Sequence, residues 1–170
     1  MQTVYDGLFA ASDAAGLGLA DVGSHALNSL RLEKAYLTRF ELTHDISPLQ
    51  AGVDRWVRPS KGEFIGRAAL EKTMAPDAWR IVYLVVDVPD APGAAVCVGG
   101  EAVFTGDTSV GLTTSGGYGF TVDKSLAFAY VTGRHAAPGT ELSILILDQH
   151  RSAVVLDGPV FDPENTQLLG

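Results

Sequence analysis

The chain has 170 residues, of which 46% are hydrophobic and 19% charged, a composition typical of one globular domain or two small ones. Its formal net charge of −8 argues against nucleic-acid partners, because binding to phosphates depends on many Lys and Arg contacts. No apolar run approaches the roughly 18 residues of a membrane span, and the N-terminus lacks the basic region of a secretion signal. We therefore expect a soluble, cytoplasmic protein without membrane contacts.

Residues 1–75 have the patterns of helices. An apolar stripe at helical spacing predicts a first helix that starts almost at residue 1 without a capping residue, ends at Gly16 and buries one face. The stripe consists of Val4, Leu8, Ala11 and Ala15. A second helix is predicted from Ser24, as its N-cap, to about Tyr36. Residues 43–52 are rich in turn-forming residues, and residues 66–74 predict a short helix.

Residues 80–160 have the patterns of strands and turns. The first strand is predicted at 80–88, where β-branched residues are frequent. Further strands are predicted at 94–98, 101–104, 108–114, 125–131, 141–147 and 152–156, with a hairpin turn at Gly99–Gly100. Short strands without intervening helices favour an antiparallel barrel or sandwich. The predicted fold class is α+β, with a partial helical layer followed by a C-terminal antiparallel β-barrel or sandwich.

Metal-binding and thiol chemistry find little support in the sequence. The histidines at 25, 44, 135 and 150 are scattered, and Glu41, His44 and Asp45 cluster in what we expect to be a solvated turn. We expect no metal site. Cys97 is the one cysteine and lies in an apolar run, which favours a buried structural thiol in a reducing compartment.

The segment 113–119 resembles two catalytic or cofactor motifs only superficially. Ser115 is not a nucleophile elbow, because Thr113 stands where that motif requires glycine. The glycines at 116, 117 and 119 do not form a dinucleotide fingerprint, since Val122 occupies the third glycine position. We predict a tight turn or loop in which backbones approach closely.

The charged end of the second helix allows two interpretations. Arg31 and Glu33 are two residues apart, so they do not face each other on a helix. In the first interpretation each ties down a neighbouring loop, with Lys34 near the C-terminal end of the helix dipole. In the second, Arg31 or Glu33 points into a ligand cleft between the helical layer and a partner.

Several motifs in order resemble a known family. They are SLRLEKAY (29–36), ELTHDISPLQAGV (41–53), KGEFIGRAAL (61–70), TSGGYGFTVDKSLAFAYV (114–131), GTEL (139–142) and PVFDPE (159–164). Together they resemble the C-terminal half of the glycine-cleavage T-protein (aminomethyltransferase) family, and most closely the folate-binding region of dimethylglycine and sarcosine dehydrogenases. The resemblance covers essentially the whole chain.

The resemblance implies a function and an incomplete body. Family members bind tetrahydrofolate at the centre of a three-domain ring and transfer a one-carbon unit to it. Their catalytic carboxylate and the glutamate that holds the pteridine would both lie upstream of Met1, so we expect no catalytic residue and no FAD site in this chain. Residues 1–56 would be the end of the second folate-binding domain, residues 57–79 a connecting segment with a short helix, and residues 80–170 the C-terminal β-barrel domain.

The resemblance also suggests candidate ligand contacts. Arg31, Glu33 and Tyr118 are the candidates for the folate cleft. In ALNSLRLEKA (26–35), Leu27 replaces the ligand-contacting arginine of the T-protein branch, which favours methylated glycines or a related methyl donor over the aminomethyl-lipoyl carrier.

We therefore expect the C-terminal portion of a tetrahydrofolate-dependent one-carbon transferase, inactive alone. Residues 1–36 would be covered by the N-terminal half, by a partner chain or by a second copy in a homo-oligomer. The alternative is a stand-alone, non-catalytic binding or assembly module derived from that family. A third hypothesis is a ligand-binding barrel that uses Trp56, Tyr118 or Trp79 as an aromatic wall.

Overall fold

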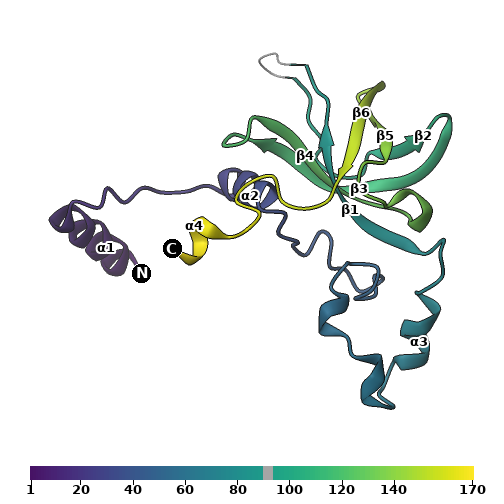
Figure 1. Cartoon of the computed structure of the whole chain (residues 1–170). Coiled ribbons are helices and arrows are strands. Elements are labelled where there is room, and N and C mark those ends of the chain that lie inside the picture. The colour runs from purple at the N-terminus through teal and green to yellow at the C-terminus, as the bar shows by residue number, and fades with distance from the viewer. Residues whose placement is uncertain (90–93) are drawn as a thin grey trace.

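The main body of the protein is a closed β-barrel of six antiparallel strands (Figure 1). The structure is a computed structural model that describes residues 1–89 and 94–170. The strands are β1 (Trp79–Val86), β2 (Ala102–Thr105), β3 (Thr108–Gly119), β4 (Lys124–Thr132), β5 (Glu141–Ile146) and β6 (Gln149–Leu156), and they close in the order β1-β4-β3-β2-β5-β6. The predicted α+β class with a C-terminal barrel is confirmed, and closure distinguishes the barrel from a sandwich.

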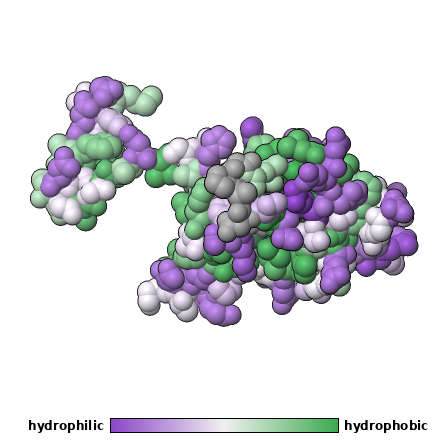
Figure 2. Space-filling model, turned by 90° about the horizontal axis from the view of Figure 1, so that it is seen from above, coloured by the Kyte–Doolittle hydropathy of each residue, from purple (hydrophilic) through white to green (hydrophobic). Residues whose placement is uncertain are grey.

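Short helices precede, connect and follow these strands. They are α1 (Gln2–Ala15), α2 (Ser24–Glu33), α3 (Arg67–Lys72) and α4 (Thr166–Leu169), with 3₁₀ turns η1 (Asp54–Trp56), η2 (Pro59–Lys61) and η3 (Gly133–His135). Helix α2 packs on β3 and β4. Helix α1 stands away from this body at the end of an extended connection, and Figure 2 shows it as a separate lobe.

The barrel wall is apolar on both sides where α2 covers it. Because successive strand residues point to opposite faces, Val82, Leu84 and Val86 of β1 fill the barrel interior, whereas Tyr83 points outward. Outside the barrel, Tyr83 joins a second buried cluster with Leu32, Leu126 and Phe128. This second cluster lies between α2 and the outer face of the barrel and holds the helix there.

Two predictions in the strand region are wrong. Residues 94–98 form no strand, although Cys97 is fully buried. Gly99–Gly100 is not a hairpin turn, because the N–H groups of Val98 and Gly99 donate to the carboxylate of Glu101 instead of to a neighbouring strand. The Glu101 carboxylate takes these two N–H groups, whereas the N–H of Gly100 donates to the carbonyl oxygen of Thr113 in β3.

Residues 115–119 belong to β3 and not to a turn. The predicted close approach is nevertheless confirmed, since a Cβ added at Gly116 would lie 2.5 Å from the Cβ of Cys97. Gly117 and Gly119 likewise lie against Leu32 and Glu33 of α2. Glycine occurs in this strand because both faces are crowded, which strand propensities do not register.

The helix predictions are correct in position and wrong in three details. Gly16 ends α1 in the left-handed conformation, as predicted. However, Ser12 is the one buried residue of α1, so its apolar face is exposed in this chain. Gly23, not Ser24, is the N-cap of α2, and this helix ends at Glu33, short of Tyr36.

Candidate functional site

The carboxylate of Glu41 is the centre of a buried polar network between α2 and the barrel. Glu41 has no exposed surface. Its Oε2 accepts hydrogen bonds from Arg31 Nη1 (3.2 Å), Thr38 N (2.7 Å) and Thr38 Oγ1 (3.0 Å). Its Oε1 accepts from Thr114 Oγ1 (3.0 Å) and Ser115 Oγ (2.5 Å) on β3. Five donors satisfy a buried negative charge, which would otherwise be costly.

Arg31 contributes the positive charge of this network. Besides Glu41, its guanidinium donates to Asn28 Oδ1 (3.0 Å) and to the carbonyl oxygen of Tyr36 (3.3 Å), and it lies 5.7 Å from the ring centre of Phe128. Its Nη2 is buried and has no hydrogen-bond partner among residues 1–89 and 94–170. Through these hydrogen bonds Arg31 connects α2 to the segment that follows it. Because its side chain is only 9% exposed, Arg31 presents little surface to a ligand.

Two tyrosines of the barrel wall strengthen the same attachment. Tyr83 donates its hydroxyl to the carbonyl oxygen of Leu32 (2.7 Å), and Tyr130 donates to the carbonyl oxygen of Glu41 (2.9 Å). Burial raises the pKa of Tyr130 to about 12, so its phenol stays protonated and remains a donor at neutral pH.

Glu33 and Lys34 attach α2 to two other segments. The carboxylate of Glu33, 2% exposed, accepts from Thr121 N (2.7 Å), and its backbone carbonyl accepts from Phe161 N (3.1 Å). Lys34 Nζ forms an ion pair with Asp162 Oδ2 at 2.9 Å. The hydrogen bond from Lys34 is the main reason why the pKa of Asp162 is lowered to about 2. Arg31 and Glu33 thus bind different partners, as their spacing predicted, and both tie down loops.

Tyr118 lies apart from these two side chains. Tyr118 lines a cavity of about 710 Å³ at one end of the barrel, together with Phe120, and the two ring centres are 5.2 Å apart. Its hydroxyl donates to Asp123, and its backbone carbonyl accepts from Ser29 Oγ of α2 (2.7 Å). The described lining of this cavity includes Tyr118 but neither Arg31 nor Glu33. The three candidate residues therefore lie on adjacent elements without converging on one cavity.

The three residues of the aromatic-wall hypothesis lie at different places in the structure. Trp56 lines a second, smaller cavity near α3, whereas Trp79 lines neither of the two. Trp56 and Tyr118 thus line separate cavities, and a ligand contact by either of them stays a prediction.

Other reactive groups are either buried or dispersed. Burial raises the pKa of the Cys97 thiol to about 12, which confirms a structural cysteine. Within residues 1–89 and 94–170, no three His, Cys, Asp or Glu side chains are placed to hold a metal ion. In the same part of the chain, no helix is both long and apolar enough to cross a membrane.

Glu41 is the central residue that sequence reasoning placed wrongly. We expected it in a solvated turn with His44 and Asp45, yet only the latter two are exposed. A signal was present, because Thr38 and Glu41 have the Thr-x-x-Glu spacing of a capping box. The Glu41 carboxylate accepts from Thr38 N as in that motif.

Comparison with known proteins assigns the barrel. Residues 80–162 match the glycine cleavage T-protein C-terminal barrel domain. The chain is 34% identical over 161 residues to mitochondrial dimethylglycine dehydrogenase of Mus musculus, covering 93% of this chain and 18% of that protein. It is 38% identical over 139 residues to the aminomethyltransferase of Streptomyces coelicolor, covering 79% of this chain and 37% of that protein.

A solved structure shares the fold. The glycine cleavage system aminomethyltransferase T from Bartonella henselae superposes with a TM-score of 0.68 at 23% identity, over 81% of this chain and 38% of that one. The chain thus spans about a fifth of the dehydrogenase and less than two fifths of the transferases. The barrel of this chain, residues 80–162, is therefore a glycine cleavage T-protein C-terminal barrel domain, and most of the chain is similar to proteins that carry this domain.

Proposed function

We propose that this chain forms the C-terminal portion of a tetrahydrofolate-dependent aminomethyltransferase-type protein. Its reaction would transfer a one-carbon unit from a methylated amine or glycine derivative to folate. The supporting observation is that most of the chain aligns with both a dimethylglycine dehydrogenase and aminomethyltransferases, while covering under two fifths of either. Within this stretch, residues 80–162 match the glycine cleavage T-protein C-terminal barrel domain.

In this proposal the chain supplies one rigid wall of the folate site. Arg31 and Glu33 are 9% and 2% exposed and satisfied mainly by internal partners, so we assign them to positioning α2. Of the three candidates, Tyr118 is the one that lines a cavity of ligand size. We therefore assign folate contact to Tyr118 and no acid–base role to any residue of the chain.

The test is a transfer assay with the purified chain. With tetrahydrofolate and an aminomethyl donor, whose carbon is already at the oxidation level of a methylene group, the 170-residue chain should form no methylene-tetrahydrofolate. A chimera in which this chain replaces the matched segment of the Streptomyces aminomethyltransferase should transfer the one-carbon unit when given that enzyme's own substrates. The proposal fails if the chain alone turns over like a complete enzyme, or if a folded chimera is inactive while its parent is active.

A second candidate function is a non-catalytic assembly module. It is favoured by the exposed apolar side chains of α1 and α2, where Val4 and Leu8 are 66% and 59% exposed and Leu27 and Leu30 are 63% and 54% exposed. Such a surface is normally covered by another chain or a second copy. If this function holds, light scattering should show oligomers that V4S/L8S disrupts, whereas Asp13→Asn on the opposite face should not. A strictly monomeric chain at high concentration would contradict it.

A further inference from the structure

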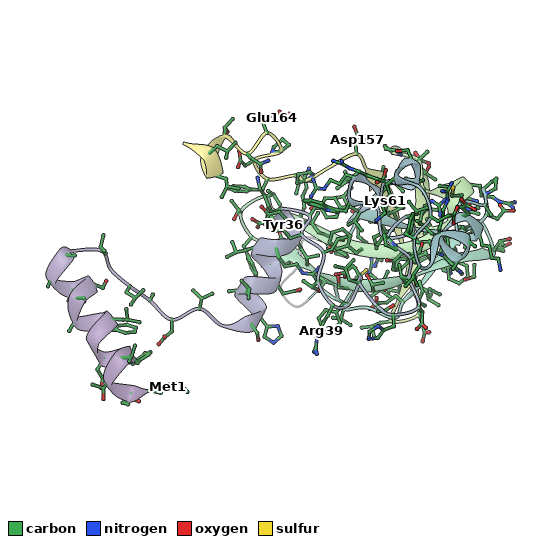
Figure 3. All side chains as sticks on the ribbon, turned by 90° about the horizontal axis from the view of Figure 1, so that it is seen from below. Met1, Tyr36, Arg39, Lys61, Asp157 and Glu164 are labelled. Carbon is green, nitrogen blue, oxygen red and sulfur yellow. The ribbon has the colours of Figure 1, made fainter. Side chains whose placement is uncertain are left out.

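A second cavity, of about 280 Å³, is lined by residues from 48 to 70, among them Trp56 of η1 and Leu70 of α3. Helix α3 lies below the barrel in Figure 1. Its walls are mostly apolar and comprise Pro48, Trp56, Val57, Phe64, Ile65 and Leu70. Two cationic side chains, Arg58 and Lys61, complete its lining with Gly66. Lys61 is labelled in Figure 3, where it lies on the barrel side of the molecule, far from Met1. None of these residues takes part in the network around Glu41.

The two cations at this cavity are not neutralised. Arg58 makes no side-chain hydrogen bond or ion pair with any described residue, and the Lys61 ammonium contacts only the Phe64 ring, 4.7 Å from its centre. The described lining contains no Asp or Glu. The acidic residue nearest to Lys61 in sequence is Glu63, two positions later, and it forms an ion pair with Arg67 at 3.4 Å. Unpaired positive charge is notable in a chain with 20 acidic and 12 basic residues.

The aromatic side chains at this cavity remain available to a ligand. Trp56 is 75% exposed, and Arg55 lies 5.1 Å from its ring centre. Phe64 is half-buried, and Ile65 beside it is fully exposed. Large apolar groups next to free cations match a ligand that carries both a ring and a negative charge.

We propose that this cavity binds a single-ring aromatic carboxylate. The planar guanidinium of Arg58 offers two parallel N–H donors to a carboxylate, and Lys61 adds a second positive charge. The ring would pack on Trp56 and Phe64. Because the volume lies just below the usual range of about 300–1,000 Å³ for ligand pockets, one ring fits better than a fused system. A neutral ring lacks the charge contact, and a simple inorganic anion lacks the ring contact.

The experiment is an NMR titration of the indole N–H signals of Trp56 and Trp79, assigned with Trp79→Phe. Benzoate is the probe, and benzamide is its neutral isostere. Benzoate should shift the Trp56 signal saturably in the millimolar range, leave Trp79 unchanged, and bind about tenfold more tightly than benzamide. R58Q/K61Q should lose about tenfold in affinity for benzoate, whereas the matched charge-removal variant K72Q/R134Q, outside the cavity, should not.

Each of the opposite outcomes overturns the proposal. Equal affinity for benzoate and benzamide would show a merely apolar surface. Equal shifts at both tryptophans, no saturable shift at Trp56, or undiminished affinity in R58Q/K61Q would show that this cavity is not the site. Circular dichroism of each variant ensures that a loss of affinity is not a loss of fold, which is expected to persist because Arg58 and Lys61 are exposed.

Discussion

Replacement of Glu41 tests how much the buried network stabilises the fold. In Glu41→Gln the amide oxygen can take the place of Oε2 and accept from Arg31 and Thr38, while the amide nitrogen faces the hydroxyls of Thr114 and Ser115, which can rotate to accept. The geometry is kept and the charge is lost. Arg31 then remains buried without a counter-ion, so we expect a loss of about 2–3 kcal/mol in the free energy of unfolding.

Glu41→Ala removes all five accepted hydrogen bonds and leaves their donors buried. The expected loss is about 4 kcal/mol or more, a large part of the roughly 5–15 kcal/mol that stabilises a typical domain. Urea denaturation followed by circular dichroism measures both variants. The exposed ion-pair variant Glu63→Gln is the matched control and should change stability by less than about 0.5 kcal/mol. Losses below about 1 kcal/mol in both Glu41 variants would refute the view that this network holds α2 on the barrel.

Three further results are expected from single residues. Since the pKa of Asp162 is lowered from 3.8 to about 2, its pair with Lys34 stabilises the fold fully above pH 3.8, and this contribution is lost as the pH falls toward 2. Denaturant midpoints in that range should therefore fall more steeply for the wild type than for Asp162→Asn, and parallel curves would contradict this. Cys97 should not react with a thiol reagent at pH 8 until urea unfolds the chain, and rapid labelling of the native protein would show that its burial is wrong. Gly116→Ala should lower the unfolding free energy by about 1–3 kcal/mol through its clash with Cys97, whereas Gly158→Ala, whose added Cβ meets nothing within 4 Å, should be nearly neutral, and equal effects would refute the close approach.

The strands with alternating or β-branched patterns were predictable from the sequence. Residues 125–131 and 141–147 were predicted within one residue of β4 and β5, because both have strongly apolar faces directed at the barrel interior. The second half of β3 was not predicted as a strand, because the glycines at 116, 117 and 119 lower strand propensity. Those glycines reflect contacts with Cys97 and with α2, which are distant in sequence.

The candidate site was less predictable, because it too depends on contacts between residues that are distant in sequence. That Arg31 and Glu33 would not pair followed from helix geometry alone. The burial of Glu41 depends on Thr114 and Ser115, which are 73 and 74 residues away along the chain. A local motif such as the Thr38–Glu41 capping box can indicate one hydrogen bond, but the neutralisation of the carboxylate is a property of the closed barrel.

Helices α1 and α2 show how differently two helices of this chain are stabilised. Helix α1 has 14 residues, no side-chain N-cap and a glycine at position 7, and isolated helices of fewer than about 12–15 residues are marginal in water. Helix α2 has only 10 residues and no side-chain cap, yet Leu32, Arg31 and Glu33 each bind the barrel or its loops. The stability of α2 therefore comes from the barrel, whereas the apolar stripe of α1 packs on no comparable surface in the described part of the chain. A short amphipathic helix such as α1 is most stable when another protein surface covers its apolar face. The transferase would supply that surface from its N-terminal half, and the assembly module would supply it from a partner chain or a second copy.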